Sequence, residues 1–180
     1  MLNVDIQKPV AYVTLDRPEI HNAFNDELIG LLTEAFQDLA THSEVRVIVL
    51  RGNGKSFCAG GDLNWMKRMV EYSQEENLED ARKMARMFTE LAKCPKPVIA
   101  RIHGAALGGG SGLAAACDIA IAVESAQFGF TEVKLGILPA VISPFVMARI
   151  GPARRNGKAR KSNGKKAGSR NGRAAPSAAE

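Results

Sequence analysis

Two glycine-rich stretches lie where the chain passes from an expected strand into an expected helix. The first covers residues 51–63 (RGNGKSFCAGGDL) and the second residues 103–112 (HGAALGGGSG). Glycine lets the main chain approach a ligand closely, and a helix that begins there offers free N–H groups and the positive end of its dipole. Such loops are typical of a site for an anion, or for a carbonyl oxygen on which negative charge develops.

Three familiar glycine motifs do not fit these loops. A dinucleotide-binding G-x-G-x-x-G counted from Gly108 would need glycine at Leu113, and a G-x-S-x-G nucleophile elbow around Ser111 fails at the same residue. A P-loop built on Lys55 would need glycine at Val49. A tight turn that uses glycine only for close packing stays open as an alternative.

The pattern of apolar residues predicts alternating strands and helices, and hence an α/β domain. A helix capped by Asn25 is expected, and the apolar residues of the 74–93 helix (Leu78, Ala81, Met84, Ala85, Phe88 and Leu91) are expected in the core. Residues 103–112 are expected as a turn. The predicted strands are 10–15, 45–50, 98–102 and 119–123. One helix is predicted after residue 25 and another after residue 63. Further helices are predicted at 74–93, at 113–117 and in a last segment that ends near Gly151.

The charge is distributed unevenly along the chain. Residues 152–180 hold nine lysines and arginines and one acid, whereas the preceding part carries a net charge of −3. Beyond Ile150 no Val, Ile, Leu, Met, Phe, Tyr, Trp or Cys occurs, so this segment cannot bury enough apolar surface to offset its ordering entropy. We therefore expect a core at 1–151 and a disordered basic tail at 152–180. Without interleaved aromatic residues, nucleic acid is an unlikely partner of that tail.

Cysteine use and hydropathy indicate a cytoplasmic protein. The chain has three cysteines and no C-x-x-C pair, which favours a reducing compartment over a disulfide framework or a zinc site. No apolar run reaches the length of a membrane span, and the N-terminus lacks the pattern of a secretion signal. The three histidines are too scattered to predict a metal site.

Five segments together resemble the crotonase (enoyl-CoA hydratase/isomerase) family. They are RPEIHNAF at 17–24, SFCAGGDL at 56–63, HGAALGGG at 103–110, ACDIA at 116–120 and FGFTEVKLG at 128–136, in the order found in that family. The resemblance implies a spiral of ββα units that is incomplete at its C-terminus. It also implies an acyl-CoA thioester as substrate, with no cofactor besides the coenzyme A of the substrate itself.

The resemblance also implies roles for individual residues. The N–H groups of Gly61 and Gly109 match the pair that holds the thioester oxygen, and Glu132 matches the family's acid/base carboxylate. Substrate-binding positions carried over in the same way are Asn22, Ala23, Ala59, Asp62, Leu63 and Thr131. Asp62 is further expected to cap the helix that follows it.

One departure from the family pattern bears on the reaction. Many family hydratases have a second glutamate on the central helix, where this chain has Gly112. The sequence around Glu132 and Asp62 is most similar to the methylglutaconyl-CoA and related branched enoyl-CoA hydratases of leucine and terpenoid breakdown, so hydration is the preferred expectation. A Δ3-Δ2 enoyl-CoA isomerase, which needs a single carboxylate, is the alternative.

A second departure lies after Gly151, where the resemblance fades into basic low-complexity sequence. Family members continue for about a hundred residues that close the acyl pocket and build a trimer or hexamer, so a truncation or a shifted reading frame is expected here. A homotrimer or hexamer would follow only if that region were complete. An inactive remnant with a polyanion-binding tail is the alternative of another class.

Overall fold

The computed structural model describes residues 1–155. Side chains are described over the same range except for Lys134, Leu135 and residues 152–155. The strands are β1 (Leu2–Gln7), β2 (Val10–Leu15), β3 (Val47–Gly52), β4 (Val98–Ile102), β5 (Ala105–Leu107), β6 (Ile119–Ala122) and β7 (Gln127–Gly129). The helices are η1 (Pro18–Ile20), α1 (Asp26–Thr41), α2 (Leu63–Met69), α3 (Gln74–Ala92), α4 (Gly109–Ala116), η2 (Glu132–Leu135) and α5 (Ser143–Arg155).

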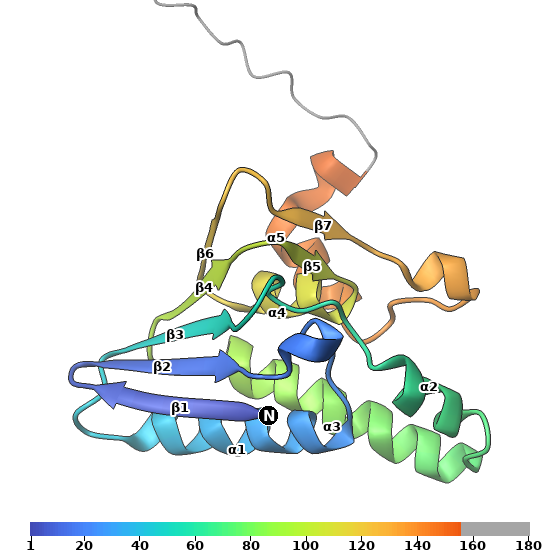
Figure 1. The fold of residues 1–180 in the computed structure, drawn as a ribbon, viewed down its shortest axis with the longest axis horizontal. Helices are drawn as coiled ribbons and strands as arrows, with labels where there is room; N and C mark the ends of the chain where they lie inside the picture. The colour runs from blue at the N-terminus through green and yellow to red at the C-terminus, as the bar shows by residue number, and fades with distance from the viewer. Residues whose placement is uncertain (156–180) are drawn as a thin grey trace, which may run out of the picture.

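The main sheet has five strands in the order β1-β2-β3-β4-β6 (Figure 1). β1 and β2 form an antiparallel pair, and the remaining neighbours are parallel. Alternate residues of β2, β3 and β4 point into the core, among them Val13, Ile48 and Ala100, which are fully buried. On the opposite face Arg51 donates a hydrogen bond to Thr14 and lies over the ring of Tyr12, so this face carries polar side chains beside apolar ones such as Val49.

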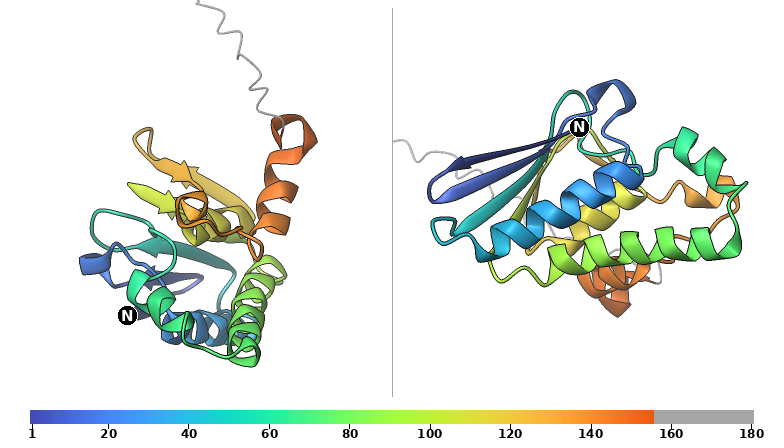
Figure 2. Two further views of the ribbon diagram at one scale, coloured as in Figure 1. Left: turned by 90° about the vertical axis from the view of Figure 1, so that its right-hand side faces the viewer. Right: turned by 90° about the horizontal axis from the view of Figure 1, so that it is seen from below.

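α1 and α3 run side by side along the buried face of the sheet (Figures 1 and 2). The Asn25 side chain accepts a hydrogen bond from Leu28 N–H, which confirms the expected cap of α1. Ser73 and Glu76 form a capping box at the start of α3. Of the face predicted to be buried on α3, Phe88 and Leu91 are in the core, but the expectations for Leu78 and Ala85 were wrong. Leu78 is 47% exposed, and Ala85 is exposed as well.

A second, two-stranded sheet pairs β5 with β7 in parallel. Cys58 joins it through an isolated parallel bridge to Ala106. The chain therefore alternates between the two sheets. It passes from the main sheet to the second one three times, from β3 to Cys58, from β4 to β5 and from β6 to β7. This repetition is the spiral of short units that the sequence predicts.

The structure corrects several of the expected boundaries. β3 lies two residues further along the chain than predicted, and β1, which carries polar residues at alternate positions, was missed. The region expected as a turn contains β5, and α4 begins at Gly109 rather than at Leu113. The last helix is interrupted at Gly151, whose φ of 69° and ψ of 170° are not helical. Of the predicted tail at 152–180, residues 156–180 lie outside the described part.

Residues 1–155 contain neither a helix that could span a membrane nor a cluster of side chains that could bind a metal. None of the helices there combines the length and the apolar character required to span a bilayer. No group of three or more His, Cys, Asp or Glu side chains comes together there as a metal site would require.

Candidate active site

Three segments of the second sheet bring the predicted site residues together. Cys58, β5 and β7 lie next to one another in parallel. Gly61 follows Cys58 by three residues, Gly109 follows the end of β5 by two, and Glu132 follows the end of β7 by three. Because parallel strands end at the same edge of a sheet, the loops that leave this edge converge, and ligands bind there in open α/β folds.

The loop that carries Gly61 is fixed by main-chain hydrogen bonds on both sides. On one side Cys58 N–H donates to Ala105 O at 3.0 Å and Leu107 N–H to Cys58 O at 2.9 Å. On the other side Phe24 N–H donates to Gly60 O and Asp62 N–H to Phe24 O, both at 2.9 Å. The loop is therefore held as a short strand between two others, which sets where the Gly61 amide points.

Glycines at the start of α4 let this helix touch that loop directly. A Cβ at Gly109 would lie 2.1 Å from the Phe24 ring, and a Cβ at Gly110 would lie 2.1 Å from Cys58 O. Neither position has room for a larger residue. The close contact brings the N-terminus of α4 against the Gly61 loop.

The two amides predicted to hold the substrate oxygen have no acceptor. Among the hydrogen bonds of the described residues, neither Gly61 N–H nor Gly109 N–H donates, although their neighbours Gly60 O, Asp62 N–H and Gly108 N–H are all paired. Buried amides are rarely left unpaired in proteins. Two free N–H groups at one cavity, one of them at a helix N-terminus, form a site for a partly negative oxygen.

The carboxylate of Glu132 lies against the turn that precedes α4. Its Oε1 would be 2.7 Å from a Cβ at Gly108, whose φ of 51° is itself in the region favoured by glycine. Its Oε2 is buried and has no hydrogen-bond partner in the described part of the chain. Because Glu132 also lines the cavity described next, its carboxylate is the candidate group for exchanging a proton with a bound ligand.

A cavity of about 830 Å³ connects these groups. It is lined by both glycines and by Glu132, and also by the predicted substrate-binding residues Ala23, Ala59, Asp62, Leu63 and Thr131. Its far wall consists of α2, the first half of α3 and residues 137–142. The apolar residues Ala81 and Met84 of α3 therefore face this cavity, which explains why the predicted core face of α3 does not continue to its N-terminus.

Asn22 does not line the cavity. It is fully buried, and its amide nitrogen donates to Asn53 O and Ser56 O, both at 2.8 Å, while its oxygen accepts from Arg17 N–H. Its φ of 56° is unusual for a residue other than glycine. The structure thus places Asn22 behind the binding surface, where it holds the loops that form that surface.

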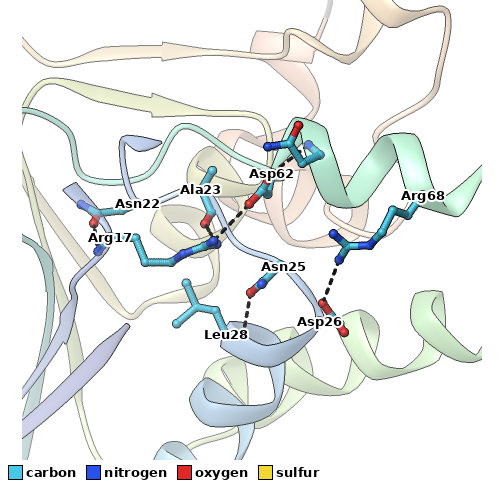
Figure 3. Close-up of polar contacts among 9 residues, drawn as sticks. Arg17, Asn22, Ala23, Asn25, Asp26, Leu28, Asp62 and Arg68 are labelled. Carbon is cyan, nitrogen blue, oxygen red and sulfur yellow. Dashed lines mark hydrogen bonds and ion pairs between the residues drawn. The ribbon is translucent and has the colours of Figure 1, made fainter. Parts of the chain in front are cut away.

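Asp62 anchors both the start of α2 and the segment before α1 (Figure 3). It accepts from Asn64 N–H at 2.8 Å, as expected of a cap, and from the Arg17 guanidinium at 3.1 Å. Arg17 in turn donates to Ala23 O at 2.7 Å. Burial acts to raise the pKa of Asp62, but hydrogen bonds from Asn64, Arg17 and Trp65 together outweigh it and leave the pKa lowered. Asp62 is therefore a charged anchor of the site and not a proton donor.

Cys58 lies close to both glycine loops but is not a nucleophile. It is fully buried, and burial raises the pKa of its thiol to about 12. A thiol must lose its proton to attack, so Cys58 stays protonated and inert at neutral pH. Its structural role is the bridge to Ala106.

The position where many family hydratases have a second glutamate is closed by apolar side chains. A Cβ at Gly112 would lie 2.5 Å from Ile142 Cγ2 and 3.1 Å from the Phe88 ring. A glutamate there would collide with both residues. Apart from Asp62, which is paired with Arg17, the described part of the site therefore contains one carboxylate near the two amides, that of Glu132.

Sequence reasoning missed several residues of this site. Gly108 was used only to test motifs, yet its left-handed turn makes room for Glu132. Trp65, the only tryptophan of the chain, lines the cavity while 98% of it is buried. The three consecutive glycines at 108–110 indicated a turn before α4. No signal in the sequence indicated which side of α2 would face the cavity.

Comparison with known proteins identifies the family. The sequence model described as enoyl-CoA hydratase/isomerase matches residues 5–162. The chain belongs to the enoyl-CoA hydratase/isomerase family. Its fold is that of the family as well: a crystal structure of an enoyl-CoA hydratase from Shewanella pealeana superposes with a TM-score of 0.82 and 43% identity, over 86% of this chain and 59% of that one.

Relatives in the enoyl-CoA hydratase/isomerase family carry out more than one reaction. The 2,3-dehydroadipyl-CoA hydratase of Escherichia coli is 39% identical over 138 residues, which are 77% of this chain and 52% of that protein. The mitochondrial Δ3,5-Δ2,4-dienoyl-CoA isomerase of Mus musculus is 40% identical over 141 residues, or 73% of this chain and 42% of that protein. The chain spans about half the length of the curated relatives it matches.

Proposed function

We propose that this protein adds water across the 2,3 double bond of an enoyl-CoA thioester. One observation carries the proposal: Gly61 and Gly109, whose N–H groups are unpaired in the described part of the chain, line one cavity together with Glu132. A pair of amides and a carboxylate are the groups that the addition of water to an activated double bond requires. Membership of the family supplies the thioester as the activating group.

The proposed reaction proceeds through an enolate. Glu132 removes a proton from water as its oxygen bonds to C3, and the electrons of the double bond shift onto the thioester oxygen. Gly61 and Gly109 N–H hold that oxygen, and the dipole of α4 stabilises its negative charge. Glu132 then returns a proton to C2, so that water is added and the enzyme is regenerated. Each such amide is worth about 10²–10³ in rate.

An isomerase reaction is the second candidate, because Gly112 leaves a single carboxylate near the amides. In that reaction Glu132 would remove a proton from C2 and return it to C4, which moves the double bond without water. The same two amides would stabilise the same kind of enolate. The absence of a second acid beside Gly112 in the described part of the site is the observation that favours this candidate.

For the acyl group we propose a branched chain of the methylglutaconyl type, as formed in leucine breakdown. The sequence around Glu132 supports this choice, and the apolar wall of the cavity fits a short branched chain. The Escherichia coli relative named as a 2,3-dehydroadipyl-CoA hydratase acts on another acyl group that ends in a carboxylate. The proposed reaction uses no group beyond the residues named and the thioester itself.

The test is the variant Glu132→Gln, which keeps the shape of the side chain and removes its basicity. We expect kcat for hydration to fall by about 10²–10⁴ while the thioester still binds. Glu124→Gln is the matched control, since Glu124 is exposed and does not line the cavity. Hydration is followed by loss of the absorbance of the conjugated thioester.

Equal hydration rates for Glu132→Gln and the native protein would reject Glu132 as the base. A 3-enoyl-CoA offered in parallel separates the two candidates: faster conversion of that substrate than hydration of the 2-enoyl-CoA would favour the isomerase. If neither substrate is converted although both bind, the proposal of catalysis by this chain fails.

We further propose that the protein is cytoplasmic, and that it would assemble as a homotrimer or hexamer if its C-terminal region were complete. Apolar residues exposed on β6 and β7, among them Ile121 and Phe128, support association. The three cysteines are unpaired, which supports a reducing compartment.

A further inference from the structure

The cavity wall opposite the reacting groups is apolar with few charges. Met66 and Met69 of α2 and Met84 of α3 contribute to it, together with Leu138 and Val141. Unbranched methionine side chains adapt to chains of irregular shape. These apolar side chains suit the carbons of an acyl chain, but they offer no partner for a charge at the end of that chain.

The charged lining residues other than Lys67 have assigned partners or roles. Asp62 is paired with Arg17 at 3.1 Å, and the carboxylate of Asp80, mostly buried, is paired with Lys83 at 3.7 Å. Glu132 lies at the proposed reaction centre. The ring of His21 is held through Nδ1 by the Ser56 hydroxyl at 3.0 Å.

Lys67 is the only lysine or arginine among the lining residues of the described part of the chain, and no carboxylate there lies within 4 Å of its ammonium group. Its neighbour Arg68 does not line the cavity and faces Asp26 at 3.9 Å instead (Figure 3). A cation beside an apolar wall, with no partner in the protein, suits a ligand that brings its own anion.

The place of Lys67 on α2 sets the length of such a ligand. It follows Leu63 by four residues, so both lie on the same side of the helix, about 6 Å apart along its axis. Leu63 directly follows Asp62 and the Gly61 amide. The ammonium group therefore lies within reach of an acyl chain of about five or six carbons whose thioester oxygen is held by Gly61.

We propose that Lys67 selects acyl-CoA substrates whose short acyl chain ends in a free carboxylate. The inference rests on the proposed function and names a specificity-determining residue for it. The ammonium group pairs with the distal carboxylate, and the apolar wall accommodates the carbons between. A chain that ends in a methyl group gains the same apolar contacts but leaves the ammonium unpaired.

The experiment measures binding through the fluorescence of Trp65, the only tryptophan and a lining residue. Glutaryl-CoA and pentanoyl-CoA have equal chain length and differ in the terminal carboxylate, and both lack a double bond, so neither reacts. They are titrated into the native chain, Lys67→Met and the matched control Arg68→Met, with free coenzyme A as a further ligand. Because Lys67 is exposed, circular dichroism should show that Lys67→Met keeps its fold.

We expect glutaryl-CoA to bind the native chain about 5- to 10-fold more tightly than pentanoyl-CoA. Lys67→Met should lose this preference, and Arg68→Met should keep it. Equal affinities in the native chain would overturn the inference. So would a loss in Lys67→Met that is equal for both thioesters and for free coenzyme A, since Lys67 would then contact the phosphates. If no thioester binds the native chain, the proposed function fails and this inference with it.

Discussion

Gly108 shows how one residue can place the proposed catalytic carboxylate without itself contributing a reacting group. Its φ of 51° and ψ of −119° turn the chain from β5 into α4. A side chain at this position would occupy the space that Glu132 Oε1 takes up. The same glycine therefore fixes the direction of Gly109 N–H and leaves room for the carboxylate.

Replacing Gly108 by alanine should strongly reduce the rate of hydration and lower the stability of the fold only moderately. This sparsely populated backbone conformation costs about 1–3 kcal/mol of unfolding free energy for a residue with a Cβ, and the added methyl group displaces Glu132. We expect kcat for hydration to fall at least tenfold. In urea unfolding, the free energy of unfolding should fall by about the backbone cost given above.

Gly61→Ala is the comparison that isolates this effect. Its Cβ would meet only the flexible Met66 side chain, at 3.3 Å, and alanine keeps the N–H group. We expect activity within a few fold of native. If both variants behave alike, the space beside Gly108 does not position Glu132.

At the scale of elements, the charge of Asp62 joins α2 to the segment before α1. Because its pKa is lowered in the folded chain, the stability it contributes is complete above the unfolded value, near 3.8, and is lost as the pH falls through the folded value. The helix cap and the ion pair with Arg17 weaken together in that window.

Comparing the native chain with Asp62→Asn tests this dependence on pH. The difference in unfolding free energy should be constant above about pH 5 and shrink below about pH 4. Glu76, whose pKa is lowered by hydrogen bonds from Ser73, titrates in both proteins and cancels. Urea unfolding at several pH values, followed by Trp65 fluorescence, gives the difference. A difference that does not change with pH would show that the Asp62 charge contributes nothing to stability.

Elements with a regular apolar pattern could be predicted from the sequence, and their partners in space could not. The period of α1 and the cap at Asn25 are local signals, and both were confirmed. The face of α3 was half wrong because the same apolar pattern serves a core at Phe88 and a cavity wall at Met84. β5 was missed because it has only three residues, Ala105–Leu107, without a strand-like pattern, and it pairs only with segments from elsewhere in the chain. The family motif identified Gly61, Gly109 and Glu132 as candidates, whereas their unpaired atoms needed coordinates.

At the scale of the whole molecule, the sheet ends in an unprotected apolar edge. Within residues 1–155, β6 pairs with β4 alone, and all of its residues are exposed, Ile119 by 49% and Ile121 by 58%. Edge strands of soluble proteins are normally short, charged or covered, since open ones pair with other chains.

Ile121→Lys should therefore reduce self-association of this chain without unfolding it. A charge on an exposed edge costs little stability and opposes contact between edges. We expect light scattering to show a smaller average mass for the variant at equal concentration, with an unchanged circular dichroism spectrum. An unchanged mass would mean that β6 takes no part in association.

The winding of the chain between two sheets has a consequence for its synthesis. Gly61, Gly109 and Glu132 come from three successive passes through the second sheet, and Glu132 follows Gly61 by 71 residues (132 − 61). A nascent chain that has left the ribosome as far as α3 carries the first amide and most of the acyl-facing wall, but nothing opposite them. The proposed site is thus completed late in translation, after the hydrophobic surfaces of α1 and α3 have had time to fold onto the first strands.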